Sequence, residues 1–108
     1  VGNFYKGMLV SVPLHLETLP GAPKAADLWE ILADYYRGAE LVSVVPMDKP
    51  ADSSGRLEPE ALNDTDRMEL RVYGNETHRQ AVLVARLDNL GKGAAGAAVQ
   101  NLKLMLGL

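Results

Sequence analysis

One segment in the second half of the chain constrains the fold most strongly, because it carries the pattern of a β-hairpin. Apolar and polar residues alternate over residues 67–73, with Glu69 and Arg71 on the face predicted to be wet. A turn at residues 74–78 follows, and residues 80–87 return as a nearly continuous apolar run. A strand without polar alternation is typical of a central position with cover on both faces. The segment therefore predicts a hairpin whose second strand lies at the centre of a sheet.

A further strand pattern precedes the hairpin at residues 8–16. Apolar side chains alternate with others there, and Met8, Val10 and Val12 belong to the face that we expect to join the core. Pro13 cannot donate a hydrogen bond to a neighbouring strand. The pattern therefore predicts a strand at an edge of the sheet, or one with a bulge near its end.

An amphipathic helix and a short strand are predicted between these two regions. After a loop rich in proline and glycine, an apolar stripe recurs at helical spacing for about four turns. Gly38 is predicted to end this helix, and Trp29 is predicted to cover the seam between the helix and the sheet. The next apolar run, residues 41–45, has the composition of a short strand. The stripe of the helix consists of Leu28, Ile31, Leu32, Tyr35 and Tyr36.

A long excursion separates the short strand from the hairpin. Residues 47–67 are rich in proline, serine, asparagine and aspartate, and we expect at most a short helical turn near residues 58–62. Long loops of this kind are often functional. The order of strand, helix, strand, hairpin and helix predicts an α+β fold, in which two main helices pack on a small mixed or antiparallel sheet.

Composition limits the kind of protein that the chain can be. With 108 residues, 47% of them hydrophobic, we expect a single domain over residues 1–108. The net charge is −3 and neither sign forms a long run, which argues against nucleic acid or an anionic membrane as a partner. The absence of cysteine excludes a thiolate zinc site and a cysteine nucleophile within these residues, and no metal site is predicted. Without a membrane span or a signal peptide in the sequence, we expect a soluble, cytoplasmic protein.

The tail of the chain, residues 88–101, has the most unusual composition. Three glycines and a run of alanines lead into an apolar helix, whose small side at Gly93, Ala94 and Ala97 predicts close contact with a sheet or another domain. The helix carries few charges, so most of its circumference is expected to be buried. The backbone N–H groups of residues 89–93 also suit an anionic or amide-bearing ligand. The alternative is that the glycines only permit close helix packing.

The tail and the residues that follow it closely resemble the closing signature of N-acetyl-gamma-glutamyl-phosphate reductases of arginine biosynthesis. That family usually has DN-L-x-KGAAGxAVQN followed by leucine and methionine, and this chain has DNLGKGAAGAAVQNLKLM. Lys6 and Gly7 are similar to an arginine and glycine pair that opens a strand in the family. The resemblance implies the C-terminal part of a longer enzyme that also has an N-terminal nucleotide-binding domain. The start at Val1, within what looks like a loop, leads us to the same expectation.

The resemblance also implies the chemistry of the whole enzyme. In the family a cysteine attacks the acyl phosphate, phosphate leaves, and NADPH reduces the thioester to a semialdehyde with help from a histidine. We carry over no catalytic residue, because the chain has no cysteine and neither His15 nor His78 lies in a matching context. Asn89, Lys92 and Gly93 are implied as cofactor-binding residues, which face the nucleotide-binding domain and its NADP.

Lys6 is implied as a residue of the pocket for the substrate phosphate, and a homodimer is implied by the family. One turn departs from the family pattern, because Asp64, Thr65 and Asp66 stand where a Gly-Ser-Asn type turn is common. The substrate contacts of that loop are therefore not carried over. Two alternatives stay open, namely a related semialdehyde dehydrogenase and a stand-alone α+β interaction module whose small-residue helix docks a partner.

Overall fold

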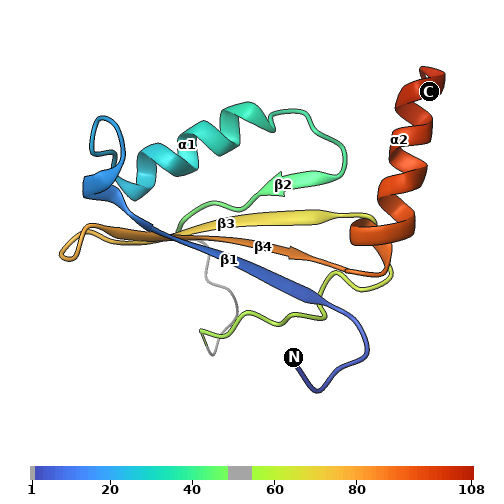
Figure 1. The fold of residues 1–108 in the computed structure, drawn as a ribbon, viewed down its shortest axis with the longest axis horizontal. Helices are drawn as coiled ribbons and strands as arrows, with labels where there is room; N and C mark the ends of the chain where they lie inside the picture. The colour runs from blue at the N-terminus through green and yellow to red at the C-terminus, as the bar shows by residue number, and fades with distance from the viewer. Residues whose placement is uncertain (1, 49–54) are drawn as a thin grey trace.

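The computed structural model describes residues 2–48 and 55–108, which form a four-stranded sheet with a helix above it and a second helix beyond its end (Figure 1). The elements are β1 (Met8–His15), the short 3-10 turn η1 (Leu16–Thr18), α1 (Ala25–Tyr35), β2 (Val42–Val44), β3 (Met68–Asn75), β4 (Gln80–Leu87), the π-helical turn η2 (Gly91–Ala95) and α2 (Gly96–Leu106). The order of elements agrees with the predicted one, including turns rather than a helix at residues 59–64 of the long loop.

The four strands form one mixed sheet in the order β1-β4-β3-β2. Strand β4 pairs antiparallel with both β1 and β3, whereas the short β2 runs parallel to β3. The predicted hairpin and its central second strand are confirmed, and β1 with Pro13 lies at an edge, as predicted. The α+β fold with a small mixed sheet and two main helices is confirmed as well.

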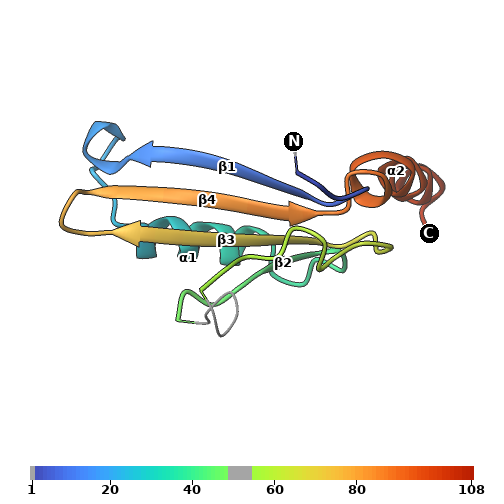
Figure 2. The same cartoon turned by 90° about the horizontal axis from the view of Figure 1, so that it is seen from below.

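Helix α1 covers one face of the sheet on the side of β3 and β2 (Figure 2). Helix α1 approaches β3 closely at Gly74. This is possible because Gly74 has no side chain, whereas a Cβ there would lie only 2.4 Å from the Cβ of Ala25. The indole N–H of Trp29 donates to the carbonyl of Val45 at 2.8 Å, which confirms the predicted cover of the seam between helix and sheet. The core between the helix and the sheet consists of Leu16, Ala25, Val72 and Ala81.

Two predictions of burial are wrong on this face. Val10 and Val12 are 43% and 46% exposed, and Met8 is exposed as well, although the alternation of β1 predicts core positions for all three. Ile31 and Tyr35 of the predicted helix stripe are also exposed. For the β1 side chains the reason is that α1 lies over β3 and β2 and leaves the β1 edge uncovered (Figure 2).

The prediction of a wet opposite face on β3 is wrong too. Glu69 and Arg71 are buried there together with Arg86, because the loop that precedes β3 runs beneath the sheet (Figure 1). One carboxylate oxygen of Glu69 accepts from Arg71 Nε at 2.9 Å, and the other accepts from Arg86 Nε at 2.8 Å. Arg86 also donates to the carbonyl of Glu58 in the loop at 3.2 Å. Charges can be buried when they are paired and hydrogen-bonded in this way.

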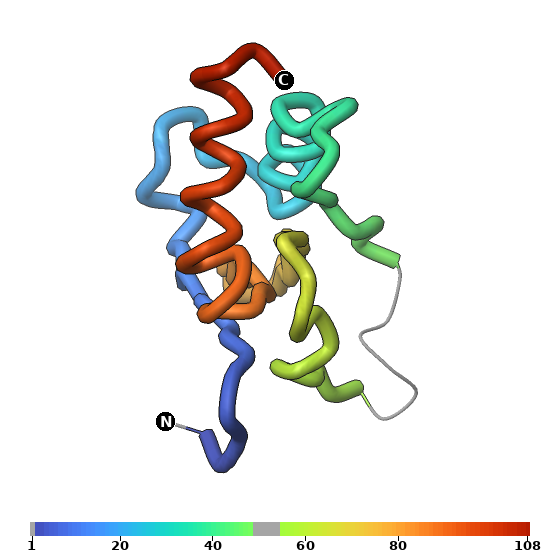
Figure 3. Tube along the Cα trace, turned by 90° about the vertical axis from the view of Figure 1, so that its right-hand side faces the viewer, coloured from blue at the N-terminus to red at the C-terminus, as the bar shows by residue number. Residues whose placement is uncertain are grey.

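Helix α2 stands apart from the sheet. It begins beyond the end of β4, rises on the side of the sheet that carries α1 and contacts mainly its own first turn, η2 (Figure 1 and Figure 3). Leu104 and Met105 are 71% and 83% exposed. The predicted burial of most of this helix is therefore wrong for the chain by itself. Neither helix in the described ranges is long and apolar enough to cross a membrane.

Candidate functional site

Three segments that are distant in the sequence meet where β4 ends. They are the arm that precedes β1, the end of the long loop, and the start of the tail. We call this place the β4 junction and define it by Lys6, Asn63, Asp64, Asp88 and Asn89. It brings charged and amide side chains from different segments together, and two of them, Lys6 and Asn89, line a hollow.

Asp88 is the centre of the β4 junction, and its side chain is only 2% exposed. Its Oδ1 accepts the backbone N–H groups of Leu90 at 2.9 Å and Gly91 at 3.1 Å, so the carboxylate closes the turn that starts the tail. Its Oδ2 accepts the backbone N–H of Asp64 at 2.8 Å. An aspartate that accepts backbone N–H groups two and three residues later is a typical turn-forming residue. The same carboxylate therefore fixes both the tail and the long loop.

Lys6 lies between two carboxylates. Its ammonium contacts the side chain of Asp64 directly and lies 3.8 Å from Oδ2 of Asp88. The hydrogen bond that the Lys6 ammonium donates to the carboxylate of Asp64 is the main reason that the pKa of Lys6 is raised above its ordinary value. The pKa of Asp88 is lowered, chiefly by the backbone N–H of Asp64, then by the N–H groups of Leu90 and Gly91 and by the charge of Lys6. Both groups are therefore held in their charged forms.

Asn89 connects the tail to the arm before β1. Its Oδ1 accepts the backbone N–H of Gly7 at 2.8 Å, and Nδ2 of Asn63 donates to the carbonyl of Lys6 at 3.0 Å. Gly7 has a φ of +118°, and a Cβ there would lie 2.6 Å from the carbonyl oxygen of Pro59. Only glycine fits this position, so the arm is held by its backbone on both sides.

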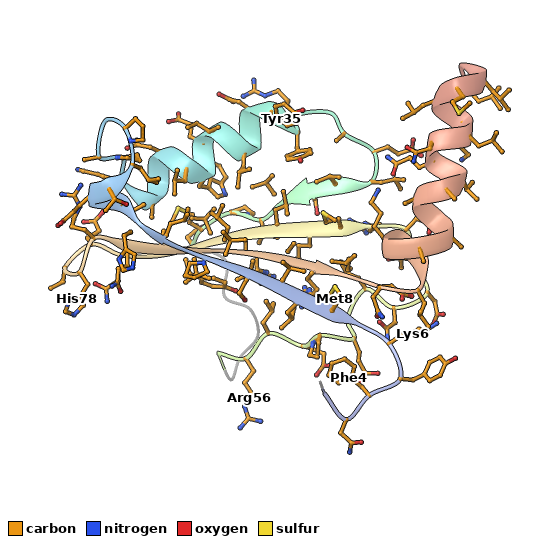
Figure 4. The ribbon with its side chains drawn as sticks, viewed as in Figure 1. Phe4, Lys6, Met8, Tyr35, Arg56 and His78 are labelled. Carbon is orange, nitrogen blue, oxygen red and sulfur yellow. The ribbon has the colours of Figure 1, made fainter. Side chains whose placement is uncertain are left out.

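A hollow of about 620 Å³ lies beside the β4 junction, on the side of the N-terminal arm. Lys6 and Asn89 both line it, together with Phe4, Met8 and other residues of the arm (Figure 4). Two of the four predicted site residues are therefore brought together in one place, one from the arm and one from the tail. A lysine and an amide beside an open hollow can bind and orient an anionic or polar group.

Lys92 and Gly93 do not line this hollow. Lys92 is buried within η2, and its ammonium donates to Oε1 of Gln100, eight residues further along the chain in α2. Gly93 lies against Leu87, since a Cβ there would be 3.3 Å from Leu87 Cδ1. The close packing predicted as the alternative reading of the glycines is thus found at Gly93.

Sequence reasoning missed three members of the β4 junction, namely Asn63, Asp64 and Asp88. The signal for Asp88 was an aspartate placed directly before a glycine-containing turn. No local signal marks the other two, because their partners lie in segments more than 20 residues away. Lys6, by contrast, was found through the family resemblance.

The two histidines lie at the other end of the sheet. His78 lies in the turn of the hairpin and Lys6 lies at the opposite end (Figure 4), and His15 pairs with Gln80 next to that turn. Within residues 2–48 and 55–108, no group of three His, Cys, Asp or Glu side chains could hold a metal ion. The β4 junction therefore offers positioning groups, and no nucleophile with a base beside it.

Comparison with known proteins gives two results. Residues 1–89 match the family described as semialdehyde dehydrogenase, dimerisation domain. The chain is also 50% identical over 107 residues to proteins named N-acetyl-gamma-glutamyl-phosphate reductase from Brucella ovis, Brucella canis and Brucella abortus. The aligned region covers 99% of this chain and 34% of each of these relatives. The chain thus spans about a third of the length of the curated relatives it matches.

Proposed function

The chain belongs to the family of semialdehyde dehydrogenase dimerisation domains, and on this premise we propose that it is the C-terminal substrate and dimerisation domain of a reductase. The whole enzyme would convert N-acetyl-gamma-glutamyl phosphate to N-acetylglutamate semialdehyde and release phosphate, with NADPH as the hydride donor. The observation that carries the proposal is the 50% identity to proteins named as this reductase over 99% of the chain. The tail signature at residues 88–105 supports it.

In this proposal each site residue has a role that follows from its position at or near the β4 junction. Lys6 contacts the phosphate of the substrate, and Asn89 orients the ligand from the other side of the same hollow. Both residues line that hollow, which supports their assignment to one site. Lys92 and Gly93 belong to the turn that faces the nucleotide-binding domain and its NADP. The buried position of Lys92 makes it a residue that shapes this turn from within.

Two partners follow from the proposal. A nucleotide-binding domain of the same polypeptide covers the outer face of α2, and a second copy forms a homodimer in the cytoplasm. Exposed apolar side chains on α2 support the first partner. The uncovered β1 edge, with Val10 and Val12, supports the second. Sedimentation of the complete gene product is expected to give a dimer, and a clean monomer at high concentration would contradict this part.

The activity is tested with the complete gene product that carries this chain. Purified protein is expected to reduce NADP when N-acetylglutamate semialdehyde and phosphate are both present, and to be inactive without phosphate. The 108-residue chain by itself is expected to be inactive, because it contains no cysteine. Pure, folded protein that gives no turnover with this substrate would overturn the assignment.

A stand-alone interaction module is the second candidate, and the exposed apolar face of α2 is the observation that favours it. The two candidates differ in the gene upstream of Val1. A glycine-rich nucleotide-binding motif and a cysteine in the encoded protein favour the reductase, whereas a start codon at this point favours the module. A related semialdehyde dehydrogenase would share these upstream features, and the substrate assay of the complete gene product distinguishes it from the reductase.

A further inference from the structure

The two carboxylates that neutralise Lys6 differ in how firmly they are held. The Asp88 side chain is 2% exposed and accepts three backbone N–H groups, so it cannot leave without opening the turn and the loop. The Asp64 side chain is 79% exposed, and within the described residues its side-chain partner is Lys6. Exposed ion pairs are weak, because water competes for both charges. Of the two carboxylates, only that of Asp64 can be exchanged for another anion.

The backbone of Asp64 stays in place when its side chain moves. Its N–H is held by Oδ2 of Asp88 at 2.8 Å, and the adjacent Thr65 N–H donates to the carbonyl of Leu62 at 3.2 Å. Asp64 has a φ of +64°, a left-handed conformation that aspartate tolerates better than most residues. A rotation of the side chain therefore releases the ammonium of Lys6 without unfolding the turn.

The released ammonium would be next to space that an anion can enter. Lys6 lines the hollow of about 620 Å³, which is large enough for a phosphorylated metabolite. Asn89 lines it too, and because its Oδ1 already accepts from Gly7, its Nδ2 group is the part able to donate to a ligand. While Asp64 remains, one ammonium faces two carboxylates, and this net negative charge opposes an anionic ligand.

We infer that Asp64 is an internal substitute for the anionic ligand of Lys6. It pairs with the ammonium in the free protein, and a phosphate or acyl-phosphate group replaces it on binding, while Asp88 keeps the lysine in position. Asp64 thereby lowers the affinity for weakly charged anions and leaves a dianionic phosphate as the ligand able to displace it. The identity of the acyl phosphate rests on the proposed function, whereas the exchange of anions on Lys6 does not.

The test is a titration of the 108-residue chain with inorganic phosphate. Binding is monitored by NMR through the backbone amide resonances of Gly7 and Asp64. Four proteins are compared: the unchanged chain, Asp64→Asn, Lys6→Met, and Glu60→Gln as a control that removes one negative charge from the same loop. Asparagine tolerates a positive φ, so Asp64→Asn keeps the turn. We expect Asp64→Asn to bind phosphate about two- to five-fold more tightly than the unchanged chain, as the loss of one exposed ion pair predicts. Lys6→Met is expected to abolish binding.

Two results would overturn the inference. One is equal phosphate affinity of Asp64→Asn and Glu60→Gln, which would mean a general effect of charge. The other is the absence of saturable binding to both the unchanged chain and Asp64→Asn. Failure of the proposed function has a different readout, because an inactive gene product whose chain still binds phosphate through Lys6 would leave this inference intact. An active reductase without the Asp64→Asn effect would refute the inference alone.

Discussion

Helices α1 and α2 have the same length, 11 residues each, and yet they have opposite surroundings. Helix α1 lies on the sheet and shares a core with Leu16, Val72 and Ala81. Within the described residues, helix α2 is fixed mainly at its root, through η2 and the β4 junction, and it exposes Leu104 and Met105 along its length. The difference shows that an apolar helix in this chain need not stabilise the chain itself. Helix α2 is firmly held at its first turn and exposes apolar side chains along its length. This combination suits a helix that is presented to a partner.

The largest expected effect is a loss of stability caused by a substitution in the core beneath α1. Leu16→Ala removes a buried side chain beneath α1 and is expected to lower the free energy of unfolding by about 2 to 5 kcal/mol. Leu104→Ala is the matched change in α2, where it is expected to stay within about 0.5 kcal/mol of the unchanged chain because the side chain is exposed. Denaturant unfolding of both variants measures the difference. Equal losses would mean that α2 packs on the chain after all.

A smaller effect is expected at the root of α2. Asp88→Asn keeps the shape of the side chain but removes the charge that Lys6 and three backbone N–H groups share. We expect a loss of stability smaller than that of Leu16→Ala, with faster amide hydrogen exchange at Leu90 and Gly91 and unchanged exchange in α1. Asp34→Asn, an exposed change in α1, serves as the control. If hydrogen exchange rose equally in both helices, Asp88 would not stabilise the start of α2 independently of α1.

The pH dependence of this effect has a definite sign. The pKa of Asp88 is lowered from its ordinary value of 3.8, so its contribution to stability is present above 3.8 and disappears as the pH falls through the lower pKa of the folded state. The pKa of Lys6 is raised from 10.5, so its contribution is complete below 10.5 and disappears as the pH rises through the higher folded pKa. Unfolding curves of the unchanged chain and Asp88→Asn should therefore converge in acid. Curves that stay apart there would exclude the carboxylate as the cause.

The smallest effect on the chain itself is expected on the outer face of α2. Met105→Ser changes an exposed side chain and should leave the unfolding free energy of the 108-residue chain within about 0.5 kcal/mol. In the complete gene product the same change should lower the melting temperature, because it would introduce a polar group into the interface proposed for α2. Thermal unfolding of both proteins with and without the substitution measures this contrast. No change in either protein would remove the argument for a partner on α2.

The fold could be read from the sequence where the signal is local. The alternation in β1 and β3, the turn of the hairpin and the apolar run of β4 depend on neighbouring residues, and these predictions are confirmed. The burial of Glu69 and the exposure of Val12 could not be read in this way. The first depends on a loop that crosses beneath the sheet, and the second on how far α1 extends over it.

The candidate site was predictable only in part for the same reason. The tail signature drew attention to Asn89 and Lys92, and the family resemblance to Lys6, but a sequence pattern does not tell which of them meet. The structure places Lys6 and Asn89 beside one hollow and buries Lys92 elsewhere. The central position of Asp88 depends on N–H groups from two different segments, so it became apparent only in three dimensions.

Hydrogen exchange in α2, measured in the 108-residue chain and in the complete gene product, tests most directly whether this helix is presented to a partner domain. We expect the amides of residues 96–106 to exchange much more slowly in the complete protein, because the proposed nucleotide-binding domain would cover the helix there. The amides of β3 and β4 should exchange alike in both proteins, since their hydrogen bonds lie within the sheet. Equal exchange in α2 would contradict the claim that this helix is presented to a partner domain.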